Sequence, residues 1–203
     1  MSAEWIDRDF VEEAFVGADF SLRELRGCRF SACSFRFANF GEARVEGCTF
    51  DACDFSNARL NSSTHRDTAY LNCQFGNASL FGATFVGCKL VGSAFPEADL
   101  TALAIKGGDW SFASLRGHDL ARLDLRGVWL IEADLAECKL VKADLRDADL
   151  SRAVLWNADL GEADLRGATL DGVDLSFVKL KGARIDIAQA IIIAESHGAR
   201  VEV

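Results

Sequence analysis

The stretch that decides the fold runs from Glu132 to Leu170 and reads EADLAECKLVKADLRDADLSRAVLWNADLGEADLRGATL. A leucine recurs in it at every fifth position, and a small residue, mostly alanine, stands two places before each leucine. In a helix a step of five residues rotates the side chain by about 140°, and in a flat strand it moves the side chain to the opposite face. The chain must therefore turn a corner between successive leucines.

A short extended segment followed by a corner, repeated four times, returns the chain above its start after about twenty residues. The same five-residue register continues without a slip from Phe10 to Ile185. Its thirty-six central positions hold Phe, Leu, Ile, Val, Tyr70 or Trp110, with His65 as the one exception. We therefore predict one all-β, four-sided solenoid over residues 1–185, in which the central residues form a continuous core.

The register stops after Ile185, and residues 186–203 change to helical spacing. Asp186 is placed as the helix N-cap, Gln189 completes a capping box, and Gly198 ends the helix. Either this helix caps the solenoid, or it caps the solenoid and also joins a second subunit, with the final residues as a short edge strand. Because one coil end cannot cover so broad an apolar helix, we predict a homodimer through Ile187, Ala190, Ile191, Ile192, Ile193 and Ala194.

Composition bounds the class of protein only loosely. The chain has 203 residues and a formal net charge of -9, which is typical of a soluble acidic protein. Its N-terminus lacks an apolar run behind a basic region, and nowhere do eighteen apolar residues follow one another. These features predict a cytoplasmic protein without a membrane association.

Chemistry-bearing residues do not converge in the register. The histidines His65, His118 and His197 stand far apart, and no triad, phosphate-loop or metalloprotease spacing occurs. All seven cysteines occupy the small place two before a central residue, so we interpret them as reduced core fillers. We predict no enzyme activity, no metal and no cofactor. The seven are Cys28, Cys33, Cys48, Cys53, Cys73, Cys88 and Cys138.

Two positions depart from the register's pattern. His65 stands at a core position within a polar stretch, residues 61–68. Three interpretations are open: a buried histidine with hydrogen-bond partners, a histidine turned outward by a local bulge, or a functional histidine. Pro96, the only proline, follows a central residue at a corner, where it fits a turn and costs a ladder hydrogen bond only if the neighbouring coil expects a donor. We interpret Pro96 as structural.

Aspartate is the distinctive surface residue, because it recurs just before the central position and points outward. For any single aspartate, a hydrogen bond to the corner backbone is the simpler explanation. The column formed by Asp124, Asp144 and Asp164 suggests more, since repulsion at one-coil spacing would cost stability and therefore indicates a basic partner. The eight are Asp119, Asp124, Asp134, Asp144, Asp149, Asp159, Asp164 and Asp174. Outward aromatic residues, including Phe112, Trp129, Trp156 and Phe177, could add contact area, although scattered surface aromatics are common.

The run of A-D-L-x-x units from Phe10 to Ile185 resembles the pentapeptide-repeat proteins. The ending Ala183-Arg-Ile-Asp-Ile-Ala-Gln-Ala190 with His197-Gly198 is similar to the mycobacterial MfpA type and its Qnr relatives, which protect DNA gyrase from fluoroquinolones. The resemblance implies a right-handed quadrilateral β-helix, a dimer through C-terminal helices, and an acidic rod that imitates duplex DNA without binding nucleic acid itself. Qnr proteins of Gram-negative bacteria carry loops that break the register, and this chain has none.

Two function hypotheses follow. In the first, the protein is a DNA mimic that binds DNA gyrase, through one or both of the two kinds of gyrase subunit, and modulates supercoiling. In the second, it is a general interaction scaffold without a topoisomerase role. For the first hypothesis the expected gyrase-binding residues are Asp124, Asp134, Asp144, Asp149, Asp159, Asp164 and Asp174.

Overall fold

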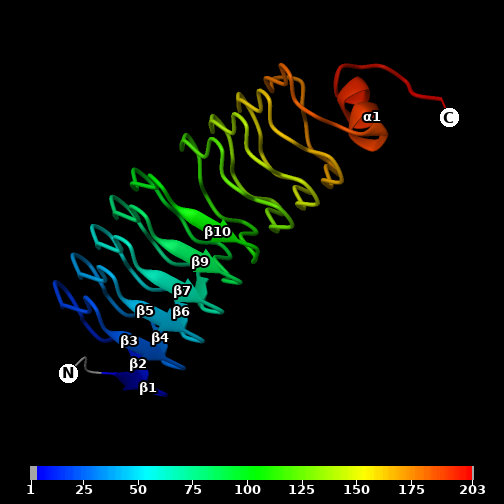
Figure 1. The fold of residues 1–203 in the computed structure, drawn as a ribbon. Helices are drawn as coiled ribbons and strands as arrows, with labels where there is room; N and C mark the ends of the chain where they lie inside the picture. Colours follow the sequence, from blue (N-terminus) through cyan, green and yellow to red (C-terminus); the bar gives the residue numbers. More distant parts are fainter. Residues whose placement is uncertain (1–3, 203) are drawn as a thin grey trace. The chain divides into compact units, whose positions relative to one another are not determined.

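The computed structural model describes residues 4–202, which form two compact units, one ending at Trp110 and one beginning at Ser111. Each unit is a stack of four-sided coils whose backbone bonds to the coil before and the coil after (Figure 1). The predicted class, a quadrilateral β-solenoid with a C-terminal helix, is confirmed. The finer division into residues 1–185 and 186–203 stays a prediction.

In the first unit two sides of the coil are long enough to form parallel sheets. Partner residues are twenty positions apart, as in Trp5 with Leu25, so the predicted coil length is confirmed. The first sheet has the order β1 (Trp5–Ile6), β3 (Glu24–Arg26), β5 (Arg44–Glu46), β7 (Thr64–Arg66), β9 (Thr84–Val86) and β10 (Ala104–Lys106). The second sheet has the order β2 (Asp9–Val11), β4 (Arg29–Ser31), β6 (Thr49–Asp51) and β8 (Ala69–Leu71).

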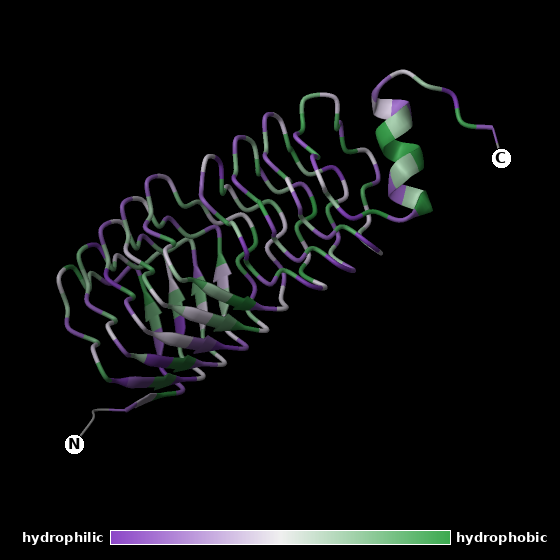
Figure 2. Ribbon diagram, turned by 45° about the horizontal axis from the view of Figure 1, so that its top comes forward, coloured by the Kyte–Doolittle hydropathy of each residue, from purple (hydrophilic) through white to green (hydrophobic). Residues whose placement is uncertain are grey.

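In the second unit, the coils pair through single bridges, which form four columns. The columns are Ser114–Asp134–Val154, Asp119–Lys139–Asp159–Lys179, Asp124–Asp144–Asp164–Arg184 and Trp129–Asp149–Thr169. The helix α1 (Ile187–Ser196) follows the last coil, and Figure 2 shows how much of it is hydrophobic. Its N-cap is Asp186 with the Gln189 capping box, as predicted. Within residues 4–202, no helix has the length and apolar character needed to cross a membrane.

One pentapeptide, Ser34–Ala38, shows why a five-residue unit is sufficient. The N–H groups of its first, second and fourth residues bond to carbonyls of neighbouring coils at 2.9, 2.7 and 3.1 Å, and the N–H of Ala38 bonds to the carbonyl of Phe35 at 3.0 Å and closes the turn. The fourth residue, Phe37, has φ of 59°, as a type II turn requires at its third position. The third residue, Arg36, lies at the corner, and its N–H takes no part in these bonds.

The core consists of the central residues and the small residues beside them. Phenylalanines twenty apart stack face to face, with ring centroids 5.1 Å apart for Phe15 and Phe35 and 4.8 Å apart for Phe75 and Phe95. All seven cysteines are free and buried. The predicted core is wrong at its end, because Ile185 is 37% exposed where the chain leaves the coil for α1.

Pro96 and Gly108 show how local backbone geometry selects residues. The carbonyl of Pro96 accepts a bond from Asn77 at 2.9 Å, and its missing N–H falls at the corner position that contributes nothing to the ladder, so Pro96 costs no ladder bond. Gly108 has φ of 102°, and a Cβ there would overlap the carbonyl oxygen of Cys88. A side chain at Gly108 would therefore separate the two coils.

His65 is fully buried and hydrogen-bonded, as the first of the three interpretations from the sequence predicts. Its Nε2 lies 2.7 Å from the Ser63 hydroxyl and its Nδ1 lies 2.7 Å from the Tyr70 hydroxyl. Its ring stacks on Phe85 with a centroid distance of 4.5 Å. Burial lowers the pKa of His65 from 6.5 to about 3, so the folded protein holds this histidine neutral.

We predict that replacing His65 by Phe lowers the free energy of unfolding by ~1–3 kcal/mol, because the buried Tyr70 hydroxyl loses its partner. Adding Tyr70→Phe should recover most of that loss, as measured by urea unfolding at pH 7. Since the folded pKa is depressed, the His65 contribution is complete above pH 6.5 and is lost as the pH falls toward 3, at ~1.4 kcal/mol per pH unit. Equal pH dependence in the wild type and His65→Phe would contradict this assignment.

Candidate functional site

The eight outward aspartates of the second unit first serve the backbone. In each, Oδ1 accepts the N–H of the residue two positions on, with distances from 2.9 Å at Asp149 and Asp174 to 3.3 Å at Asp164. That N–H belongs to the corner residue, whose donor the coil-to-coil ladder does not use. The simpler explanation from sequence, an Asx-type turn at each position, is therefore confirmed.

The column of Asp124, Asp144 and Asp164 is neutralised by arginine. Each carboxylate takes two bonds from the arginine two positions on, at 2.8 Å to Nε and 2.6–2.7 Å to Nη2. The arginines Arg126, Arg146 and Arg166 alternate with the aspartates. Arg126 and Arg146 also approach the aspartate of the next coil, at 3.6 and 3.9 Å.

The predicted repulsion within this column is therefore wrong. We expected repulsion because we considered the aspartate before each central residue and not the arginine after it. Arg184 adds a further cation 3.4 Å from Asp164. The Arg166 hydrogen bond is the main reason that the pKa of Asp164 falls to about 2, so the column stays fully ionised and internally paired at neutral pH.

The structure does not bring the seven expected gyrase-binding aspartates onto one face. Asp124, Asp144 and Asp164 form one column, whereas Asp149 lies in the Trp129 column and Asp134 in the Val154 column. Asp174 follows that last column by one coil, at twenty residues from Val154. Asp159 lies in the remaining column, which begins at Asp119, and it stands between Lys139 and Lys179.

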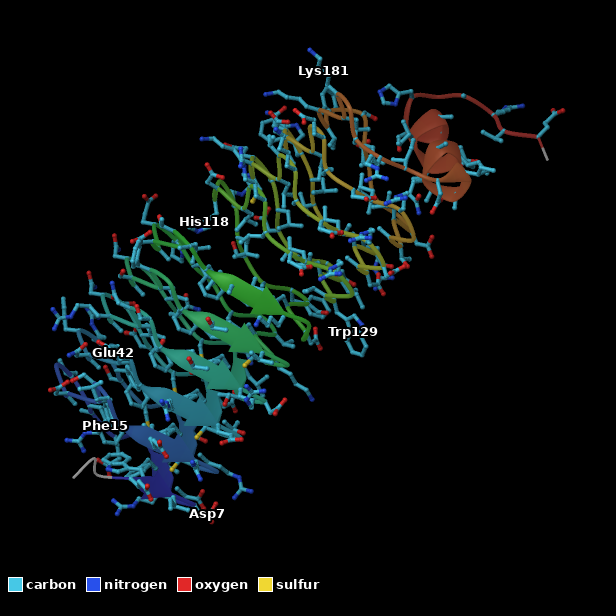
Figure 3. The ribbon with its side chains drawn as sticks, viewed as in Figure 1. Asp7, Phe15, Glu42, His118, Trp129 and Lys181 are labelled. Carbon is cyan, nitrogen blue, oxygen red and sulfur yellow. The ribbon has the colours of Figure 1, made fainter. Side chains whose placement is uncertain are left out.

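The side that carries Asp159 is rich in lysine. Lys139 lies 3.8 Å from Asp119, Lys179 lies 3.9 Å from Asp159, and Lys142 lies 3.3 Å from Glu162. In Figure 3, Lys181 projects from the second unit on the side away from Trp129. A basic partner is therefore not attracted to this side.

The two adjoining sides that carry the Trp129 and Val154 columns differ in composition, and we call them the acidic-aromatic side. Their carboxylates outnumber their two cations, Arg116 and Arg152. Arg116 is bonded to Asp134 and Glu137, at 3.0 and 3.3 Å, and Arg152 is bonded to Glu132 at 2.7 Å. The acidic residues of this side are Glu132, Asp134, Glu137, Asp149, Asp171 and Asp174.

The same side gathers the large exposed apolar residues of these coils. Their exposed fractions run from 45% to 64%, and they are Phe112, Trp129, Val154, Trp156 and Phe177. Val154, Trp156 and Phe177 border a shallow recess of about 250 Å³ that also contacts Asp174 and Arg152. From the sequence we interpreted these aromatic residues as scattered. Arranging the sequence in rows of twenty residues, one coil to a row, places them on two adjoining sides.

Helix α1 leaves two residues of its predicted dimer stripe exposed, Ile187 and Ala190. The buried residue of α1 is Gln189, whose Nε2 donates to the Ala168 carbonyl at 2.9 Å. Ile187 is 81% exposed, and Ala190 is exposed as well. The remaining predicted interface residues, Ile191, Ile192, Ile193 and Ala194, are half-buried. The helix thus covers the coil end with one face and presents another apolar face outward.

No group of three or more His, Cys, Asp or Glu side chains within residues 4–202 is arranged to hold a metal ion. Burial raises the pKa of the Cys88 thiol to about 11 and that of Cys138 to about 12, so these thiols are poor nucleophiles and poor ligands at neutral pH. The chemical resources of the exposed surface are therefore charge, aromatic area and hydrogen bonding, which suit binding to another macromolecule.

Comparison with solved structures places the fold. Full-length QnrB1, a plasmid-mediated fluoroquinolone resistance protein, matches with a TM-score of 0.86 at 22% identity, over 97% of this chain and 100% of that chain. A trypsin-treated variant of QnrB1 matches with a TM-score of 0.85 at 22% identity, over 98% and 100%. HetL, involved in heterocyst differentiation regulation in the cyanobacterium Nostoc sp. strain PCC 7120, matches with a TM-score of 0.51 at 26% identity, over 89% and 86%.

A search of curated protein sequences found no match. The family model for pentapeptide repeats, in contrast, matches residues 15–51, 28–64, 111–147, 130–160 and 148–185. These segments together span more than half of the sequence and include coils from both units. The chain belongs to the pentapeptide-repeat family.

Proposed function

We propose that this protein is a dimeric, acidic binding protein that engages DNA gyrase in the cytoplasm, modulates or inhibits supercoiling, and protects the enzyme from fluoroquinolones. The observation that carries the proposal is the structural match to QnrB1, which spans nearly the whole of both chains. The protein acts by occupying a surface of its partner, as a binding protein and not as an enzyme.

The acidic-aromatic side is the surface that best supports contact with a DNA-binding saddle. Its carboxylates exceed its cations, whereas the Asp124 column is paired with arginine and the Asp159 side carries lysines. Among the seven expected aspartates, Asp134, Asp149 and Asp174 lie on this side. Carboxylates in excess can take the place of backbone phosphates in a basic groove, and such contacts weaken as salt increases.

The scaffold hypothesis remains the second candidate, and the paired Asp124 column is the observation that favours it. A surface on which each carboxylate bonds to a neighbouring arginine does not resemble the uninterrupted charge of a DNA backbone. If the acidic-aromatic side has no effect on gyrase, a general interaction role is the better account.

A pair of triple variants separates these hypotheses. We predict that Asp134→Asn, Asp149→Asn and Asp174→Asn together raise the concentration needed to inhibit gyrase supercoiling by about tenfold, since exposed charge contacts contribute up to ~1 kcal/mol each. The matched control combines Asp124→Asn, Asp144→Asn and Asp164→Asn and should have a smaller effect. Asparagine keeps an oxygen that can accept the corner N–H, so both variants retain the turn bonds.

The measurement is a supercoiling assay over a range of salt concentrations, with circular dichroism to confirm folding. Loss of inhibition in the control and retention in the first variant would place the contact on the Asp124 column. Wild-type inhibition by both folded variants, or no inhibition by the wild type, would favour the scaffold role.

The dimer is a separate part of the proposal, supported by the exposure of Ile187 and Ala190 on α1. We predict that the wild type has twice the chain mass of 22.1 kDa in light scattering and that Ile187→Glu reduces it to one chain. Glutamate in the first turn of a helix is favourable for the helix itself, so the variant tests the interface without weakening α1. Ala199→Glu, which adds the same charge at an exposed position beyond the end of α1, is the control. If the wild type is monomeric, α1 only covers the end of the last coil and does not join two subunits.

A further inference from the structure

We propose that the recess bordered by Val154, Trp156 and Phe177 receives a single cationic side chain, an arginine or lysine, from a basic segment of a protein partner. The proposal concerns how this surface recognises a side chain and does not depend on the partner being gyrase. Three properties of the recess support it: its size, the chemistry of its walls, and the carboxylate beside it.

The size of the recess fits one side chain. Its volume of about 250 Å³ lies below the ~300–1,000 Å³ of pockets that hold drug-sized ligands. It lies between two successive coils, with Trp156 on one coil and Phe177 on the next. A partner helix would need a longer groove with several anchor positions, whereas one extended side chain needs only this depression.

The walls of the recess suit the two parts of a long cationic side chain. Val154 is 45% exposed, Trp156 is 49% exposed and Phe177 is 64% exposed, so apolar area is available to solvent on both coils. The aliphatic stem of arginine or lysine packs on such area while its charged end stays near water. An indole face is also the aromatic surface that attracts a guanidinium most strongly.

The charge of the recess is supplied by Asp174. Hydrogen bonds from the Ser176 side chain and backbone, at 2.6 and 2.9 Å, lower the pKa of Asp174, so it is ionised at neutral pH. Among the described residues, Asp174 forms no ion pair with a lysine or arginine. A guest cation would therefore meet a fixed and oriented carboxylate.

Arg152 lines the recess as well, and this cation is already engaged. Its Nε and Nη2 lie 2.9 and 2.7 Å from Glu132 Oε1, on the coil before it. The surrounding surface adds Glu137 and Asp171. A second copy of this acidic surface would be repelled here, whereas a basic segment would be attracted.

The test uses the full chain labelled with ¹⁵N and a short peptide that alternates glycine and arginine. We expect the indole N–H signal of Trp156, assigned from a Trp156→Phe variant, to shift in a saturable manner as the peptide is added. A lysine peptide should produce the same shift with its own affinity. A peptide with citrulline in place of arginine keeps the shape without the charge and should not saturate the signal.

Asp174→Asn should weaken the affinity for the arginine peptide by about fivefold, which lies within the range of exposed charge pairs. Asp149→Asn is the matched control, because Asp149 accepts the Ser151 N–H and hydroxyl at 2.9 and 2.6 Å in the same arrangement but lies outside the recess. It should leave the affinity unchanged. Equal weakening by the two variants, equal binding of the citrulline peptide, or the absence of a saturable Trp156 shift would each overturn the proposal.

Discussion

The rest of the structure depends on one constraint in the backbone of a regular pentapeptide such as Ser34–Ala38: the coil-to-coil ladder and the turn use four of its five N–H groups. The fifth belongs to the residue after the central one, and it lies at the corner. In the second unit, aspartate two positions earlier accepts that N–H, as Asp134 does for Ala136 at 3.1 Å. In the first unit, Pro96 meets the same need by having no N–H at all, and Ala94 stands where the aspartate would otherwise be.

This constraint changes how the charge of the protein should be understood. Aspartate recurs because the corner needs an acceptor, so the frequency of acidic residues is partly a property of the fold. Whether an aspartate also adds net negative charge to the surface depends on the residue after the central position. Arginine there pairs with it, as Arg146 does with Asp144, whereas Ser151 leaves the charge of Asp149 uncompensated. Partner binding therefore depends on the neighbours of the aspartates more than on the aspartates themselves.

The sequence was sufficient for the fold because a five-residue period with small inward residues admits few other structures. It also predicted the buried cysteines, which depend on position within the register alone, and the Asp186 cap, which depends on the local capping-box pattern. The pairing of Arg126 with Asp124 and Asp144 was missed, because it requires the contacts across the corner and between coils together. The recess beside Trp156 was missed because it involves side chains from two coils, and the exposure of Ile185 depends on how α1 packs.

The central claim is that aspartate in this repeat satisfies the corner N–H, and amide hydrogen exchange tests it most directly. Ala121 and Val141 occupy equivalent corners on successive coils, but Ala121 follows Asp119 and Val141 follows Lys139. We predict that the Ala121 amide is protected and the Val141 amide exchanges faster. In Asp119→Ala the protection of Ala121 should fall to that of Val141, while the ladder amides of Leu120 and Arg122 keep theirs. Equal protection of Ala121 and Val141 in the wild type would contradict the claim.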